Sequence, residues 1–170
     1  TVVAVTLVAE EGVLNDEAIT QMSLGGARLR GHALAENLVC HAGETDAGRL
    51  SMIRSVRIAT HPEMRRRGLA SMLVAKVHSL HQPDLFGTTF GATAGVLRFR
   101  RSVGYVLVRM GAALGRRTGA PSVVMVHAVS PAAADLVARL QQKAARDLPY
   151  QVTLLRAEGV HEEALCEALL

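Results

Sequence analysis

Runs of hydrophobic residues predict several strands, beginning close to the start of the chain. The apolar, β-branched stretch from Val2 to Ala9 is typical of a strand, and the EEG sequence after it predicts that the strand ends there. The sequence MIRSVRIAT predicts a second strand, ended by a His-Pro pair, with Ile53, Val56 and Ile58 buried. LFGTTFG predicts a short third strand, and two runs of β-formers on either side of GRRTGAP predict a hairpin.

Between these strands, hydrophobic residues recur every three or four positions, which predicts helices. GHALAENLVCHA has this spacing, as does the segment that starts at Gly68. AGVLRFRRSV predicts another helix, with Val96 among its inward residues. Ser130 and Pro131 form a helix start, and that helix is expected to run to about Arg146. YQVTLL, which follows, fits either a strand or a continued helix, and HEEALCEALL fits a helix.

The order of these elements is strand, loop, helix, strand, helix, strand and hairpin. It predicts a mixed α/β layer, and not a doubly wound fold, because too few strand–helix alternations precede the hairpin. We expect a boundary near Ser130, with a sheet domain over residues 1–130 and the start of a helical tail subdomain over residues 131–170. The first residue is not Met, so we expect that the first strand region is trimmed.

Composition restricts the class of protein. Hydrophobic residues make up 49% of the 170 residues, which excludes a disordered chain, and no apolar run approaches the ~20 residues that cross a bilayer. Cys40 and Cys166 lie in apolar sequence without further ligands at metal-binding spacing. We therefore expect buried thiols in a reducing compartment, no metal site, no membrane partner and a cytoplasmic location.

Charge is distributed unevenly along the chain. The net charge of +4 divides into −5 over residues 1–48, +11 over residues 49–117 and −2 over residues 118–170. The central block contains twelve arginines and one lysine against two acids. Such a block predicts anionic partners, either the phosphates of a cofactor or a nucleic acid.

The loop HPEMRRRGLA concentrates positive charge at the predicted start of a helix. The first amides of a helix lack partners within it and carry partial positive charge, to which Arg65, Arg66 and Arg67 add their own. Gly68 has no Cβ, so an anion can approach the backbone closely, and Ala70 keeps the first turn slim. No GxxxxGK[ST] motif occurs in the chain, so nucleotide hydrolysis has no visible site.

This loop resembles the cofactor loop of the GNAT acetyltransferases. Their pattern of Arg or Gln, two variable residues, Gly, one variable residue and Gly or Ala is matched by Arg65, Gly68 and Ala70. The resemblance implies the GNAT acyl-CoA N-acyltransferase fold, a mixed sheet flanked by helices, and acetyl-CoA as cofactor. By the same resemblance, the pyrophosphate and the pantetheine arm would be held by Ile58, Ala59, Thr60, Arg65, Arg66, Arg67, Gly68, Leu69, Ala70 and Ser71.

A narrower resemblance covers about residues 8–130. GHALAENL, VRIATHP, FGAT, LRF and GYVLVRMG, in that order, are similar to the acetyltransferase domain of the tRNA(Met) cytidine acetyltransferases. The resemblance implies transfer of acetyl to the exocyclic amine of a tRNA cytidine. It also implies a helicase module that is missing from this chain.

The chain departs from these families in the second half of the expected pocket. GNAT enzymes often have a tyrosine acid where this chain has Arg100, and a guanidinium does not titrate in the useful range. Gly95 stands where the cytidine family tends to have Glu. We expect Arg101 to supply a cofactor phosphate contact one turn away.

A second group of arginines, Arg98, Arg100, Arg116 and Arg117, predicts an RNA contact, and a merely solvated face fits them equally well. Aromatic residues are only 3% of the chain, so an RNA contact would depend on phosphates and shape.

No catalytic residue can be assigned from the sequence. His61 suits a general base, but a histidine before proline is more often solvent-facing, and His32 fits packing at a helix start. Glu10 and Glu11 fit a solvated turn better than a cleft. Two rival functions share the predicted fold: a GNAT acting on a protein or small-molecule amine, and a catalytically degenerate RNA-binding module.

Overall fold

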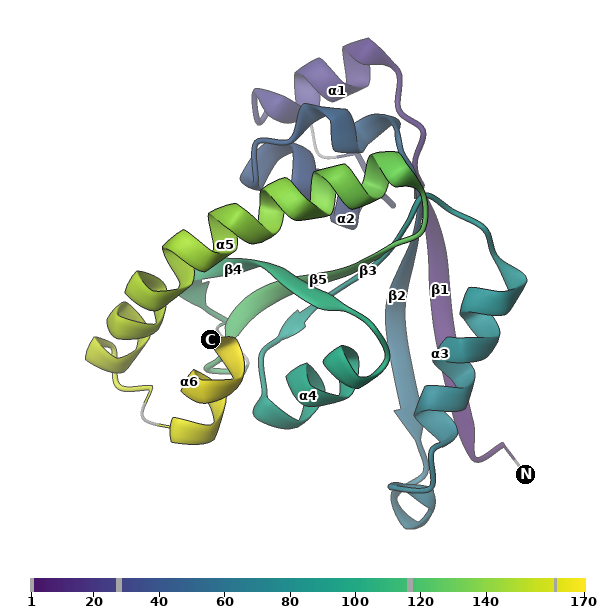
Figure 1. Ribbon diagram of the computed structural model, residues 1–170, viewed down its shortest axis with the longest axis vertical. Helices are drawn as coiled ribbons and strands as arrows, with labels where there is room; N and C mark the ends of the chain where they lie inside the picture. Colours follow the sequence, from purple (N-terminus) through teal and green to yellow (C-terminus); the bar gives the residue numbers. More distant parts are fainter. Residues whose placement is uncertain (1, 27–28, 116–117, 161) are drawn as a thin grey trace.

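The protein is a five-stranded mixed sheet covered by helices, described here from a computed structural model over residues 2–26, 29–115, 118–160 and 162–170 (Figure 1). The strands lie in the order β1-β2-β3-β5-β4, and the β2–β3 pair is parallel while the others are antiparallel. Their bounds are β1 Ala4–Gly12, β2 Ser51–Thr60, β3 Leu85–Gly91, β4 Val106–Leu114 and β5 Pro121–Ala128.

Helices cover both faces of this sheet. One face carries α1 (Asp16–Ser23), α2 (Ala33–Glu36), the π-helix Asn37–His41 and the 3₁₀ helix Thr45–Arg49. The other face carries α3 (Leu69–Leu80), α4 (Ala94–Ser102) and α6 (Glu163–Leu169). The long α5 (Pro131–Ala157) runs beside the edge strand β4, as Figure 1 shows.

The strand residues alternate between two hydrophobic cores, one on each face. Ile53 and Phe86 point into the core beneath α3 and α4, whereas the preceding residues Met52 and Leu85 point into the core beneath α1 and α2. This alternation follows from the two-residue period of a strand. Because both faces are covered, β5 has consecutive buried apolar residues from Val123 to Val126.

The two parallel strands separate after four paired residues. Met52 to Ser55 of β2 pairs with Leu85 to Thr88 of β3, and beyond this point β2 pairs with β1 alone and β3 with β5. The separation coincides with a β-bulge, because Leu7 pairs with Arg57 and the next residue, Val8, with Ser55. Val56 is the extra residue, and it is exposed, so the prediction that it is buried was wrong.

The first strand is longer than predicted, and its last acid is buried. β1 runs through both glutamates to Gly12, and the side chain of Glu11 is fully inaccessible. Glu11 accepts hydrogen bonds from the amides of Leu34 (2.7 Å) and Ala35 (3.3 Å) and from the guanidinium of Arg54. The solvated turn predicted for Glu11 was therefore wrong, since this carboxylate joins the sheet to the start of α2.

Other features differ from the sequence predictions or resolve an alternative that they left open. The helix α1 was not predicted, and Val96 is exposed on α4 instead of facing inward. α5 continues through Pro149 to Ala157, so YQVTLL is helical. Leu136 of α5 packs in one core and Leu148 in the other, and the boundary expected near Ser130 stays a prediction. Within the described part of the chain, no helix combines the length and apolar character that a membrane span needs.

Replacing Glu11 is expected to destabilise the fold. Glu11→Gln removes the charge that compensates the half-buried Arg54, and breaking a buried ion pair costs about 3–5 kcal/mol. Urea denaturation at neutral pH would measure the free energy of unfolding. Glu10→Gln, at the exposed neighbouring position, should stay within about 0.5 kcal/mol of the wild type. Equal stability of the two variants would contradict the structural role of Glu11.

Candidate functional site

The loop between β2 and α3 has a backbone suited to binding an anion. After a 3₁₀ turn at Pro62–Met64, Arg66 and Gly68 take left-handed conformations, with φ of +61° and +78°. Gly68 is the residue before the first turn of α3 and its φ is rarely adopted by residues with a Cβ. A Cβ built on Gly68 would meet no atom within 4 Å, so space is open beside the first amides of α3.

A groove of about 420 Å³ lies between this loop, the end of β2 and α4. Seven residues predicted to bind the cofactor line it: Thr60, Arg65, Arg66, Gly68, Leu69, Ala70 and Ser71. Met64, Gly95 and Phe99 also line it; Gly95 was expected in the second half of the pocket, whereas Met64 and Phe99 were not expected there. Gly95 and Phe99 are four residues apart on α4, so they share a helix face, and this spacing is the signal that identifies them.

Four residues predicted to bind the cofactor lie outside the groove lining. Ile58 and Ala59 belong to the part of β2 that pairs with β1 alone, so its other edge has no strand partner among the described residues. Arg67 is exposed on the loop. Arg101 lines a different hollow, between α4, β4, α5 and α6, because it points away from the groove on α4. The predicted phosphate contact of Arg101 was therefore misplaced.

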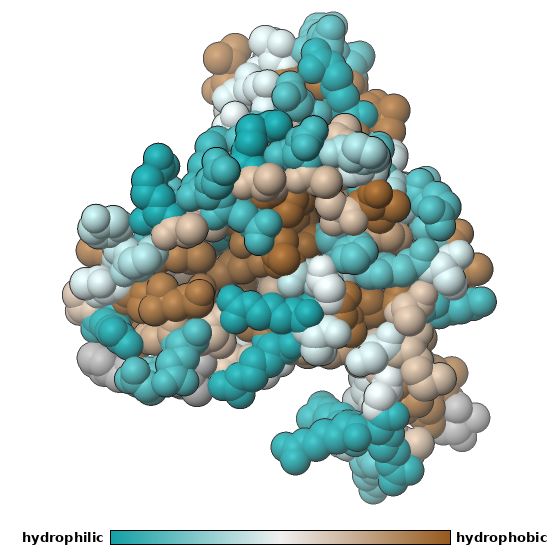
Figure 2. Space-filling view, viewed as in Figure 1, coloured by the Kyte–Doolittle hydropathy of each residue, from teal (hydrophilic) through white to brown (hydrophobic). Residues whose placement is uncertain are grey.

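The loop is strongly polar and positively charged. Figure 2 shows it as a hydrophilic projection at the lower right of the molecule, and the exposed side chains of Arg65, Arg66 and Arg67 belong to it. Glu63 is the one acid between His61 and Ser71. Backbone amides and arginines together make this end of the groove the more favourable one for phosphate groups.

The predicted RNA-binding arginines differ in their exposure to solvent. Arg98 is exposed on α4. Arg100 is 3% exposed, and its Nη2 donates a hydrogen bond to Ser55 Oγ at 2.8 Å, so its prediction as an RNA contact was wrong. Arg100 lies on the inner face of α4 with Leu97, three residues before it. Arg116 and Arg117 lie outside the described residues.

The residues considered for acid–base chemistry have structural partners or lie on the surface. His32 Nδ1 accepts a hydrogen bond from the amide of Gly12 at 3.2 Å, which fits a packing role at the start of α2. His61 and Glu10 are exposed, and Glu11 is engaged by Arg54. Among the described residues, no three His, Cys, Asp or Glu side chains cluster as metal ligands would.

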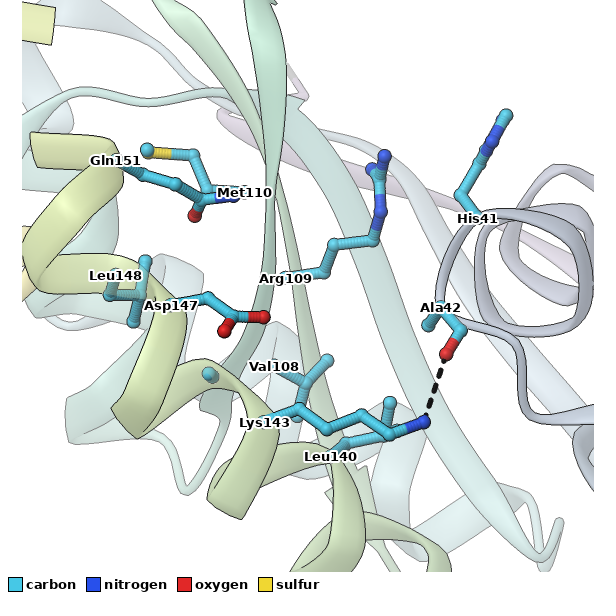
Figure 3. A pocket seen from close by; sticks show the side chains of 11 residues that line it. His41, Ala42, Val108, Arg109, Met110, Leu140, Lys143, Asp147, Leu148 and Gln151 are labelled. Carbon is cyan, nitrogen blue, oxygen red and sulfur yellow. Dashed lines mark hydrogen bonds between the residues drawn. The ribbon is translucent and has the colours of Figure 1, made fainter. Parts of the chain in front are cut away.

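A second cavity, of about 220 Å³, lies between the π-helix, β4 and α5 (Figure 3). The cations at its edge already have protein partners. Lys143 Nζ donates to the carbonyl of Ala42 at 3.1 Å and to Glu44 Oε1, and Arg109 Nη1 donates to Asn37 Oδ1 at 3.1 Å. Burial lowers the pKa of Arg109. An anion has fewer free donors here than at the β2–α3 loop.

Comparisons with known proteins show which families this chain resembles. The family model GNAT acetyltransferase 2 matches residues 1–83. The tRNA(Met) cytidine acetyltransferase TmcA of Nitrosococcus halophilus is 34% identical over 89% of this chain and 21% of its own length. TmcA of Haloarcula marismortui is 37% identical over 81% of this chain and 18% of its own length. The chain therefore spans about a fifth of these relatives.

Among solved structures, Arabidopsis thaliana NAA60 in complex with a bisubstrate analogue aligns with a TM-score of 0.48 and 13% identity. The alignment covers 74% of this chain and 64% of that chain.

The left-handed backbone at Gly68 predicts that an added Cβ lowers the stability of the fold. The same change at Gly95 is the control, because it should not lower stability. Gly68→Ala should lower the free energy of unfolding by about 1–2 kcal/mol, because a Cβ disfavours the left-handed conformation even in open space. Gly95→Ala also adds a Cβ into open space, but in a helix with ordinary φ. It should leave stability unchanged or raise it by up to about 1 kcal/mol. Urea denaturation distinguishes the two, and a stable Gly68→Ala variant would contradict the assigned conformation.

Proposed function

The chain belongs to the GNAT acetyltransferases, and we propose that its groove between the β2–α3 loop and α4 binds acetyl-CoA for N-acetylation of a tRNA cytidine. Acetyl-CoA is the acetyl donor of that family. The observation that carries the proposal is that the groove lies beside the first residues of α3 and reaches Thr60, at the end of a strand whose edge β3 has left. A phosphate-bearing, extended molecule fits both features.

Each part of the groove has a separate task in this proposal. The amides from Gly68 to Ser71, with Arg65 and Arg66, hold the pyrophosphate. The open edge of β2 near Ile58 and Thr60 offers backbone hydrogen bonds to the amide groups of the pantetheine arm. These contacts need no particular side chain on the strand, which is consistent with the mixed residue types there.

Acetyl-CoA supplies an acetyl group already activated as a thioester. The protein's contribution is to orient that group where β2 and β3 separate and to present an acceptor amine to it. Backbone amides at the separation are suited to stabilise the oxyanion of the transition state. We assign no general base, since His32 and Glu11 are engaged elsewhere.

The acceptor is assigned by analogy with relatives that are named for it. TmcA proteins are tRNA(Met) cytidine acetyltransferases, and the basic central block of this chain suits an RNA partner. The relatives are about five times longer, so we propose that a helicase module outside this chain assists the reaction. We propose a cytoplasmic location for this reaction.

The cofactor site is tested by isothermal titration calorimetry with acetyl-CoA. Gly68→Asp puts a negative charge beside the proposed pyrophosphate and should weaken binding at least about tenfold. Gly25→Asp is a matched control, because Gly25 also has positive φ and an open Cβ position but lies at the end of α1. Unchanged affinity in Gly68→Asp would remove the loop from the site. A similar loss in both variants would indicate a general effect of charge.

The acceptor is tested by incubating this chain with elongator tRNA(Met) and radiolabelled acetyl-CoA, without ATP. We expect little or no acetylcytidine, because extruding a base costs a few kcal/mol and the chain has few aromatic residues to stack on it. Addition of a full-length relative's helicase region should raise the yield. Multiple turnovers by the chain alone would contradict this expectation. Acetylation of polyamines or peptides instead of tRNA would favour the rival GNAT function.

A further inference from the structure

Arg100 is a buried cation whose hydrogen-bonding capacity is mostly unused. Arg100 is 3% exposed, and its Nη2 donates a hydrogen bond to Ser55 Oγ at 2.8 Å. Nε and Nη1 are both inaccessible and have no hydrogen-bond partner among the described residues. Arginine usually reaches a buried position only with a carboxylate or phosphate beside it.

The surroundings of Arg100 provide aromatic rings and no anion. Its Cζ lies 5.5 Å from the ring centre of Phe99 and 5.2 Å from that of Tyr105. None of the ion pairs in the described part of the chain includes it. Burial lowers the pKa of Arg100, and its charge is only partly compensated by these rings. An anion that arrived here would be bound in a medium of low polarity, where charge interactions are strong.

The position of Arg100 connects it to the proposed cofactor groove. Ser55 is the last residue of β2 that pairs with β3, so the guanidinium lies where the two strands separate. Five residues of β2 lead from there to Thr60 in the groove, about 16 Å at about 3.3 Å per residue. Phe99, whose ring faces the guanidinium, also lines the groove. Phe99 therefore contacts both the guanidinium and the groove.

We propose that Arg100 stabilises the thiolate of CoA that leaves when the acetyl group is transferred. This inference rests on the proposed function. In the transfer, the acceptor nitrogen forms a bond to the carbonyl carbon, the carbon–sulfur bond breaks and its electron pair stays on sulfur. The proton lost by the amine goes to water. Arg100 acts by its charge and by the N–H groups of its two unpartnered nitrogens, Nε and Nη1, and does not donate the proton itself.

This role differs from acid catalysis and has a distinct pH signature. A protonating acid would release CoA as the thiol, whereas Arg100 favours the thiolate. Binding of CoA should therefore lower the pKa of its thiol, and affinity for CoA should rise as pH increases through that range. Desulfo-CoA has no thiol, so its affinity should not show this rise.

Three other titratable groups lie near Arg100. Their contribution to the pH dependence of CoA binding must be distinguished from that of Arg100. Burial, then His127 and Arg100, hold the pKa of His78 below its usual range, so His78 is neutral above pH 7. Burial raises the pKa of Tyr105, and its phenol stays protonated. His127 stacks on His78 with ring centres 4.8 Å apart. Because Arg100 contributes to the pKa shifts of His78 and Tyr105, these shifts change in an Arg100 variant. CoA and desulfo-CoA are therefore compared within one protein, where the titration of these two groups affects both ligands alike.

The test is calorimetry of the whole chain with CoA and with desulfo-CoA from about pH 7 to about pH 9. In the wild type, the preference for CoA should grow about tenfold or more across this range. Arg100→Met should bind both ligands with a ratio near one at every pH, and Arg100→Lys should keep part of the preference. Arg98→Met, on the exposed face of α4, should behave as the wild type.

The outcomes separate this inference from the proposed function. Equal binding of CoA and desulfo-CoA by the wild type at every pH would overturn the role of Arg100 and leave the cofactor site intact. Failure of both ligands to bind would overturn the site and this inference together. A pH-dependent preference that persists in Arg100→Met would assign the effect to another group and also overturn it. Because the wild-type trend is itself decisive, the inference does not depend on the folding of a variant.

Discussion

The separation of β2 from β3 after Ser55 is the constraint on which the rest of the structure depends. A parallel pair that stays closed would fill the middle of the sheet with hydrogen bonds and leave no strand edge to a ligand. Here the bulge at Val56 turns β2 toward β1, while Thr88 Oγ1 donates to the Ser55 carbonyl at 3.2 Å at the last paired position. α4 then lies across the gap and supplies one wall of the groove.

Two buried charged side chains next to β2, Glu11 and Arg100, differ in how far hydrogen bonds and opposite charges compensate them. Glu11 has both carboxylate oxygens engaged, one by Arg54 and the other by the first amides of α2, so its burial is fully compensated. Nη2 of Arg100 donates a hydrogen bond, whereas its Nε and Nη1 have no partner among the described residues. Stability alone favours the first arrangement, since an uncompensated buried cation could be replaced by an apolar side chain of similar volume. The unpartnered nitrogens of Arg100 fit a site that stabilises a negative charge formed during the reaction.

Much of the fold follows from periodicity, and most errors come from single residues. The strands, the hairpin and the helices α3 and α4 were predicted because their hydrophobic spacing extends over many positions. Val56 was misplaced because a one-residue bulge leaves no trace in an alternating pattern. Glu11 and Arg100 were misplaced because charged residues are normally exposed, and their partners, Arg54 and Ser55, are distant in sequence. The loop at Gly68 was recognisable because its chemistry is local, whereas the contribution of Phe99 required the fold.

The way α5 joins the two cores has a consequence for how the protein is made. Leu140 completes one core and Val152 the other, and Lys143 reaches the Ala42 carbonyl across 101 positions of sequence. On the ribosome, the sheet residues emerge well before this helix, and until it follows them the parts of both cores that it covers stay open to water. Such long-range closure is slow and exposes apolar surface in intermediates, so nascent chains of this protein are expected to depend on chaperones until α5 has emerged.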